Sequence, residues 1–345
     1  MDLATLWFFI VGVMFVIYFV LDGFDFGVGM ALPFLGKTDA KRRQMINSIG
    51  PVWDLNETWV IVAGASLFAA FPEWYATMFS GFYLALLLLL LGLIVRAVSF
   101  EWRHQRPEST WKKTFDRMII VGSILPAFLW GVAFANIAQG VALAVNPAGG
   151  FTYTGTFFDL LNPYALLGGL TTLTLFFVHG VVFIALKTDG ELQRDARALA
   201  IKSGVVAIVL GASFLVWTCL MVPHPLIFAL AAVAAVTLIG AWVMNVRGRE
   251  GWSFALTAAT IAFAVLALYM TLFVRDGGPF VMPASNPSGD MIGLTVANAS
   301  SSAYTLQVMS WAALFCLPLV LAYQGWTYWV FRKRVLTSSF EKVAH

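Results

Sequence analysis

Charged residues are scarce in this chain, and cysteines and histidines are scarcer still. Only 11% of the 345 residues are Asp, Glu, Lys or Arg and 60% are hydrophobic, whereas about a quarter of the residues of soluble domains are charged. This balance excludes an ordinary soluble globular fold. Both cysteines, Cys219 and Cys316, lie inside apolar runs without the spacing of a disulfide framework or a metal site, so we expect two buried thiols.

Long apolar runs recur along the whole chain and leave no room for a separate soluble domain. A helix of roughly 20 apolar residues crosses the hydrocarbon core of a bilayer, which is roughly 30 Å thick. The chain has nine such runs, approximately at residues 5–31, 52–71, 76–98, 118–143, 163–186, 202–222, 225–244, 253–273 and 306–330. The sequence therefore predicts an all-α polytopic membrane protein, a single integral membrane domain over residues 1–345, with two four-helix bundles plus one peripheral helix.

Two segments could be misassigned, one as a signal peptide and the other as a further membrane span. The first run lacks the basic start and small-residue cleavage site of a signal peptide, so we expect it to be retained. The segment from about 275 to 305 is too rich in Gly, Pro, Asn and Ser to be a tenth span, and we expect an ordered loop there.

The basic residues are distributed very unevenly between the predicted loops. Of the 21 Lys and Arg residues, 19 fall in alternate loops and the tail: Lys37, Lys41, Arg42, Arg43, Arg103, Arg106, Lys112, Lys113, Arg117, Lys187, Arg194, Arg197, Lys202, Arg247, Arg249, Arg332, Lys333, Arg334 and Lys342. Cytoplasmic loops carry such an excess. Nine spans therefore place the N-terminus outside and the C-terminus in the cytoplasm. Membrane topology explains the net charge of +3 without a nucleic-acid partner.

Four carboxylates lie at similar depth on the first two spans, toward the cytoplasmic side. Asp22 and Asp25 are three residues apart in LDGFDFGVGM, and Asp54 and Glu57 have the same spacing in PVWDLNETW, which puts each pair on one helical face. An acidic residue at the centre of a span costs about 3 kcal/mol and normally faces a bundle interior. The pattern indicates a buried polar site.

Helix capping is the structural alternative for these acids. The dipole at the start of the second span favours an ionised Asp54. Pro51 suits the first helical position, however, and then leaves Asp54 beyond the usual capping site. For Asp22 the capping and functional interpretations stay equally open.

Other polar residues inside the spans complete the candidate site. Arg96 is a plausible counter-ion for the carboxylates, and a mixed cluster of this kind can hold a group that exchanges protons near neutral pH. Asn136 and Gln139 are three residues apart in the fourth span. Hydrogen bonding between helices is favoured for them over a proton or quinone role.

The residues match a known family at several long motifs. The runs LDGFDFGVGM, INSIGPVWDLNETW, LFAAFPEWYA, FSGFYLALLLLLLGLIVRAVSFEWR, GVAFANIAQG, FVMPASN and SSAYTLQVMSW resemble, in order and over essentially the whole chain, subunit II of the cytochrome bd quinol oxidases. One departure is visible, because Leu55 replaces the usual glycine of the Trp-Asp-Gly-Asn motif. Trp53, Asp54 and Asn56 stay in register, and Trp53 and Asn56 are candidates for polar packing or contact with a structural quinone.

The resemblance implies a terminal respiratory oxidase that oxidises quinol and reduces oxygen to water. It implies that haem b and haem d and the quinol-oxidising loop belong to a larger subunit I. It also implies that in some members subunit II holds a structural quinone, and that the complex lies in a bacterial or archaeal cell membrane. Asp25 and Asp54 match acidic positions of a proton route from the cytoplasm, with Glu57, Asp22 and Arg96 as neighbours. On this interpretation the chain is not catalytic alone. Small single-span accessory subunits, membrane quinol and lipid are further expected partners.

Histidine usage favours a haem-free chain, with no metal site. Haem iron needs an axial ligand such as His, Cys or Met. Of the four histidines, His104, His224 and His345 lie outside the predicted spans, and His179 alone is embedded. A lone His on a membrane helix is more often hydrogen-bonded to a neighbouring helix. None of the 12 Met residues has a spacing that singles it out.

The alternative function is a proton-coupled secondary transporter, which also uses intramembrane carboxylates. The sequence lacks a clear internal repeat, and an odd number of spans does not suit an inverted repeat. A purely structural scaffold would leave Asp25, Asp54 and Glu57 without a reason.

Overall fold

A computed structural model describes residues 2–146, 150–288 and 291–338, so the tail residues Lys342 and His345 lie outside the described residues. The helices are α1 (Leu3–Leu35), α2 (Asp39–Ile49), α3 (Trp53–Ala70), α4 (Pro72–Gly81), α5 (Tyr83–Trp102), α6 (Ser109–Gln139), the 3₁₀ turn η1 (Phe158–Leu161), α7 (Pro163–Lys187), α8 (Gly190–Met221), α9 (Pro225–Val246), α10 (Glu250–Val274), α11 (Val296–Ala299) and α12 (Ala303–Val330). Two antiparallel hairpins pair β1 (Leu143–Val145) with β2 (Phe151–Tyr153) and β3 (Phe280–Ser288) with β4 (Met291–Thr295).

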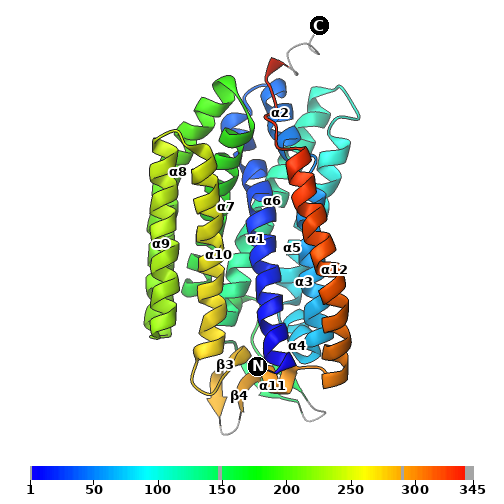
Figure 1. Cartoon of the computed structure of the whole chain (residues 1–345), viewed down its shortest axis with the longest axis vertical. Coiled ribbons are helices and arrows are strands. Elements are labelled where there is room, and N and C mark those ends of the chain that lie inside the picture. Colours follow the sequence, from blue (N-terminus) through cyan, green and yellow to red (C-terminus); the bar gives the residue numbers. More distant parts are fainter. Residues whose placement is uncertain (1, 147–149, 289–290, 339–345) are drawn as a thin grey trace.

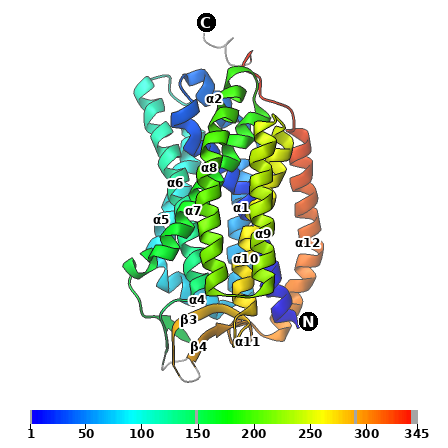
Figure 2. The same ribbon diagram turned by 90° about the vertical axis from the view of Figure 1, so that its left-hand side faces the viewer.

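The long helices run side by side along one axis (Figure 1). Within the described part of the chain, eight are long and apolar enough to cross a membrane, and the bent pair α3 and α4, with 120° between its members, can supply a ninth span. The N-terminus lies at the same end of the molecule as the hairpin of β3 and β4, while α2 and the segment after α12 lie at the other end (Figures 1 and 2). We call this second end the basic end. It carries the basic loops and is the end predicted to be cytoplasmic.

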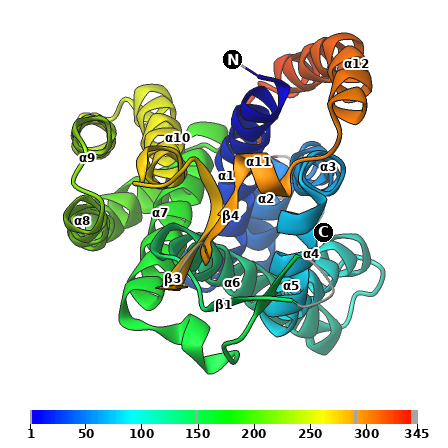
Figure 3. The same cartoon turned by 90° about the horizontal axis from the view of Figure 1, so that it is seen from below.

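Seen along the axis, the helices form two groups around α1 (Figure 3). Helices α7 to α10 pack together on one side, α3, α5 and α6 lie on the other, and α1 contacts members of both groups. Gly27 of α1 faces Gly180 of α7, and a Cβ at Gly27 would lie 2.1 Å from the Phe176 carbonyl oxygen. Glycine therefore lets α1 approach α7 at the level of the carboxylates.

The peripheral helix α12 touches the rest of the chain with one narrow face. Only 6% of its most apolar 18-residue window is buried, and Trp311, Phe315 and Leu319 are exposed. Cys316 is exposed as well, so the prediction of two buried thiols is wrong for Cys316 and confirmed for Cys219. A span surrounded by lipid has no need to bury its apolar side chains in protein.

Several predicted span boundaries need correction. The third span, expected at 76–98, begins only at Tyr83, because residues up to Gly81 belong to the separate helix α4 and Phe82 is not helical. Pro72 opens α4 and disfavours helical geometry at Phe71, which ends α3. The fourth span, expected to reach 143, ends at Gln139 because Gly140 takes a positive φ of 99°.

Other segments extend or replace the predicted elements. Helices α6 and α8 begin at Ser109 and Gly190, well before the predicted residues 118 and 202, because polar turns continue them beyond the apolar core. The segment expected as an ordered loop from 275 to 305 contains the hairpin of β3 and β4 and the short helix α11.

Candidate functional site

Arg96 is the centre of a buried ionic cluster between α1, α3 and α5. Its Nη2 donates to Asp22 Oδ1 over 2.6 Å and to Glu57 Oε2 over 2.9 Å. The Arg96 and Asp22 side chains are 0% exposed and that of Glu57 is 18% exposed. The guanidinium carbon lies 4.1 Å from the centroid of the Phe26 ring. The structure thus brings together three of the predicted site residues as one cation between two carboxylates.

Some polar atoms of this cluster have no protein partner within the described residues. They are Asp22 Oδ2, Asp25 Oδ1, Arg96 Nε and Arg96 Nη1. Buried polar atoms are almost always hydrogen-bonded to protein or ordered water, and exceptions need a physical explanation. Ordered water can satisfy these atoms, because it both donates and accepts hydrogen bonds.

Asn56 connects the fully buried Asp25 to the peripheral helix α12. Asn56 Nδ2 donates to Asp25 Oδ2 over 2.7 Å. Asn56 Oδ1 accepts from the Tyr328 hydroxyl over 2.7 Å and from Gln324 Nε2 over 3.1 Å. Gln324 Oε1 in turn accepts from Trp59 Nε1 over 3.3 Å. Asn56 is a polar packing residue that joins α1, α3 and α12.

Sequence reasoning missed Gln324 and Tyr328. A signal was available, because the two residues are four positions apart in an apolar span and so share one helical face. That face is the one that α12 turns toward α3.

Asp54 does not join the cluster. It lies exposed in the first turn of α3, and its side chain makes no hydrogen bond or ion pair with any described residue. Pro51 lies before the helix, whose N-cap is Val52, so the prediction that Pro51 opens the helix is wrong. The backbone turns at Gly50 and Pro51, where Val52 N–H donates to the Ile49 carbonyl over 2.9 Å. The neighbouring Trp53 packs against Phe100 with a ring separation of 5.3 Å.

The capping interpretation fails for Asp22, which lies within the 33-residue helix α1 and pairs with Arg96. Asn136 packs α6 against η1, since its Nδ2 donates to the Val132 and Leu160 carbonyls over 2.8 and 2.7 Å. The Gln139 backbone carbonyl accepts from Arg275 Nη1 over 3.1 Å, whereas Gln139 Oε1 has no hydrogen-bond partner within the described residues. Asn136 thus makes polar packing contacts, and the preference for packing over a quinone or proton role stays a prediction for both residues.

His179 engages protein through both ring nitrogens. Nδ1 lies 2.6 Å from Thr257 Oγ1 and Nε2 lies 3.2 Å from the Val20 carbonyl oxygen. The ring stacks on Phe254 at 4.5 Å and is fully buried. The expected hydrogen bonding to neighbouring helices is confirmed.

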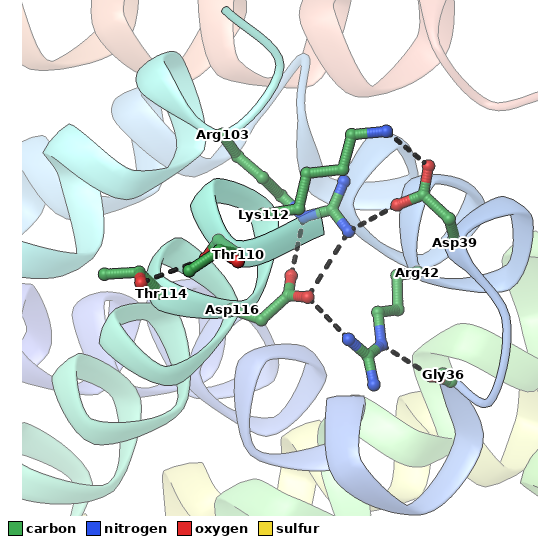
Figure 4. Close-up of polar contacts among 8 residues, drawn as sticks. All are labelled: Gly36, Asp39, Arg42, Arg103, Thr110, Lys112, Thr114 and Asp116. Atoms are coloured by element: carbon green, nitrogen blue, oxygen red, sulfur yellow. Dashed lines mark hydrogen bonds and ion pairs between the residues drawn. The ribbon is translucent and has the colours of Figure 1, made fainter. Parts of the chain in front are cut away.

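A second ionic cluster, which sequence reasoning also missed, lies at the basic end (Figure 4). Asp116 accepts from Arg103 Nε and Arg42 Nη1, each over 2.6 Å, and Asp39 accepts from Arg103 Nη2 over 2.8 Å and from Lys112 Nζ over 3.0 Å. The contacts join α2 to the end of α5 and the start of α6. The sequence offered a signal for this cluster, because acidic residues occur among the basic residues of the predicted cytoplasmic loops.

The hydrogen bonds of this cluster determine two pKa shifts. Partial burial raises the pKa of Asp39, but the hydrogen bonds from Arg103 and Lys112 outweigh burial and leave the pKa below its ordinary value of 3.8. Burial lowers the pKa of Arg103, and the two carboxylates reverse this, so the pKa is raised. Both shifts favour the charged forms of Asp39 and Arg103, and their ion pairs hold the connections between the helices together.

The chain matches the family model described as cytochrome bd terminal oxidase subunit II over residues 3–331. It is 41% identical to the cytochrome bd ubiquinol oxidase subunit 2 of Bacillus subtilis, with 97% of each chain covered. It is 35% identical to the cytochrome bd-I ubiquinol oxidase subunit 2 of Escherichia coli K12, covering 99% of this chain and 98% of the relative. The bd oxidase structure from Geobacillus thermodenitrificans shares the fold, with a TM-score of 0.77, 14% identity and coverage of 96% and 99%.

Proposed function

Because the chain belongs to the cytochrome bd terminal oxidase subunit II family and is thus a multi-pass component of a terminal oxidase complex in the bacterial plasma membrane, we propose that it provides a proton-uptake route from the basic end. In this proposal the complex oxidises quinol and reduces oxygen to water, and the protons come from the cytoplasm. The chain supplies the route and stabilises the partner subunit.

The proposal rests on the solvent exposure of the carboxylates, which decreases from the start of α3 toward the buried cluster. Asp54 is exposed at the start of α3, Glu57 is 18% exposed one turn further, and Asp22 and Asp25 are fully buried. A series of carboxylates that extends from solvent to a buried cation is suited to proton transfer, since each carboxylate can bind and release a proton. Buried oxygen atoms without protein partners on Asp22 and Asp25 are places where water can complete the route.

Each residue has a distinct role in this proposal. Asp54 and Glu57 collect protons, and Asp22 and Asp25 pass them inward. Arg96 holds Asp22 and Glu57 within one hydrogen-bond network and offsets their charge. Asn56 cannot act as an acid or base at neutral pH, so it positions Asp25.

Membership of the family implies haem cofactors in the complex, a partner subunit I and a quinol substrate. We assign haem b and haem d to the partner. The engagement of both His179 nitrogens supports this assignment, because the buried histidine of this chain offers no lone pair toward a bound haem. Contact with a structural quinone near Trp53 and binding of single-span accessory subunits remain further proposals. The family assignment favours an oxidase role over the secondary transporter.

Purification of the tagged chain in mild detergent tests the partner and cofactor assignment. A larger subunit with haem b and haem d bands in the reduced-minus-oxidised spectrum, together with quinol-dependent oxygen uptake, is the expected result. A colourless preparation of the folded chain without a partner would contradict it.

The proton route is tested with the complex reconstituted into vesicles that contain a pH-sensitive dye. Asp25→Asn and Glu57→Gln should each slow oxygen consumption and the matching internal alkalinisation by at least about tenfold, because a positioned proton-transfer group contributes roughly a hundredfold or more. The haem spectrum should be retained. Glu108→Gln is the control, because Glu108 is exposed at the same end and caps nothing with its side chain. Wild-type rates and pH profiles in both variants would refute the route.

A further inference from the structure

A cavity of about 470 Å³ opens at the basic end between α7, α10 and α12. Its walls are apolar toward the membrane and basic toward the surface. The apolar part is formed by Val52, Phe183, Leu186, Phe254, Val330 and Phe331, and the basic part by Lys187, Arg332, Lys333 and Arg334. Tyr328, Asn47 and Ser48 add polar groups, and no carboxylate is present among the lining residues.

The basic segment after α12 is fixed across this cavity. Val335 N–H donates to the Lys187 carbonyl over 2.7 Å, and the Val335 carbonyl accepts from Gln44 Nε2 over 2.8 Å. Lys187 Nζ donates to the carbonyl oxygens of Phe331 and Lys333. Figure 1 shows the segment leaving α12 and passing toward α2. The backbone that carries Arg332, Lys333 and Arg334 is therefore fixed at the rim.

The positive-inside rule accounts for basic residues in a cytoplasmic loop, but it does not require a cavity beside them. Here three consecutive cations follow a span and sit over an apolar hollow at the level where that span ends. Basic pockets between membrane helices and polybasic segments beside a span bind the phosphate of anionic lipids. The Lys333 ammonium makes no hydrogen bond or ion pair with the part of the chain that the structure describes, so it is available to a ligand.

We propose that this cavity binds one anionic phospholipid, with its phosphate between Lys333 and Arg334 and an acyl chain against Phe183 and Phe254. The inference does not depend on the proton route. Lys187, Arg332 and Arg334 each donate to backbone carbonyls, and no acid among the lining residues offsets the four positive charges. A neutral quinone would gain little from this charge, whereas a phosphodiester pairs with Lys333 and Arg334 and its chain fills the apolar wall.

Native mass spectrometry of the purified, delipidated oxidase complex tests the site. The probes are phosphatidylglycerol, phosphatidylcholine with the same acyl chains, and inorganic phosphate. Lys333→Gln should weaken binding of one phosphatidylglycerol about fivefold, and the Lys333→Gln/Arg334→Gln double variant should weaken it further, as expected for the loss of one and two surface cations. Lys113→Gln is the matched control, since Lys113 is exposed at the same end.

Val330→Trp provides an independent variant, because it fills the apolar part of the cavity and leaves every cation in place. It should also abolish binding of that lipid. Equal retention of phosphatidylglycerol by all variants would overturn the proposal. Equal binding of phosphatidylcholine would overturn the anionic selectivity, and full competition by inorganic phosphate would show a free-phosphate site in place of a lipid site.

Discussion

Arg96 of α5 donates a 2.6 Å hydrogen bond to Asp22 of α1, and neither side chain is exposed. The bond ties together two spans that are separated by α2, α3 and α4 in the sequence. It also makes a fully buried cation depend on carboxylates contributed by two other helices.

Replacement of Arg96 by Leu should lower the free energy of unfolding by about 3 to 5 kcal/mol, because removal of one partner leaves buried carboxylates without a counter-charge. The pH profile of quinol-dependent oxygen consumption should change in the same variant. Thermal unfolding of the complex and activity between pH 5 and 9 measure the two effects. Arg117→Leu removes an exposed Arg at the basic end and should change neither. An unaltered pH profile for Arg96→Leu would show that Arg96 does not tune the carboxylates.

Substitution of Asn56 by Leu should destabilise the complex by about 3 kcal/mol or more, since Asp25, Gln324 and Tyr328 each lose a buried hydrogen-bond partner. Tyr328→Phe removes one bond and should cost about 1 kcal/mol. The double variant should cost less than the two single changes together, because they share the bond between Tyr328 and Asn56. Strict additivity in this double-mutant cycle would argue against the bond.

The contact between α1 and α7 should not tolerate Gly27→Ala. The added methyl group would lie 2.1 Å from the Phe176 carbonyl oxygen and 2.7 Å from Gly180 Cα, and such overpacking costs about 1 to 3 kcal/mol. The melting temperature of the complex should fall accordingly. Gly251→Ala is the control, because nothing lies within 4 Å of a Cβ at that position. Equal melting temperatures for the two variants would mean that α1 and α7 are further apart.

The cluster of Figure 4 should make stability depend on pH through Asp39. Its folded pKa lies below 3.8 because the hydrogen bonds from Arg103 and Lys112 outweigh the effect of burial. Ionised Asp39 therefore stabilises the fold above its unfolded pKa, and this contribution is lost as the pH falls through the folded pKa. Asp39→Asn should be less stable than the parent by at most about 1 kcal/mol from pH 7 to 5, because the group is partly exposed.

The difference between the parent and Asp39→Asn should then shrink below about pH 4. Melting temperatures of the parent and Asp39→Asn at pH 7, 5 and 3.5 measure how this difference changes. A difference that grows on acidification would contradict the assigned direction of the shift.

The sequence by itself determined the membrane class, the presence of many long apolar helices and the presence of carboxylates near one end, because apolar length and the cost of burying charge act locally along the chain. It also identified Arg96 as the counter-ion, since an embedded cation needs acidic neighbours at the same depth. Pattern alone could not locate the break at Phe82, where the non-helical backbone interrupts an almost continuous apolar run.

Tertiary structure decided which of these residues meet. Spacing placed Asp54 and Glu57 on one face, yet only Glu57 reaches Arg96, because Asp54 is one turn nearer the exposed end of α3. The partner of Asp25 is Asn56, which is held by Tyr328 from a helix more than 250 residues away in the chain. Such contacts depend on how closely α1, α3 and α12 approach, and that distance is set by packing between helices, which no local pattern encodes.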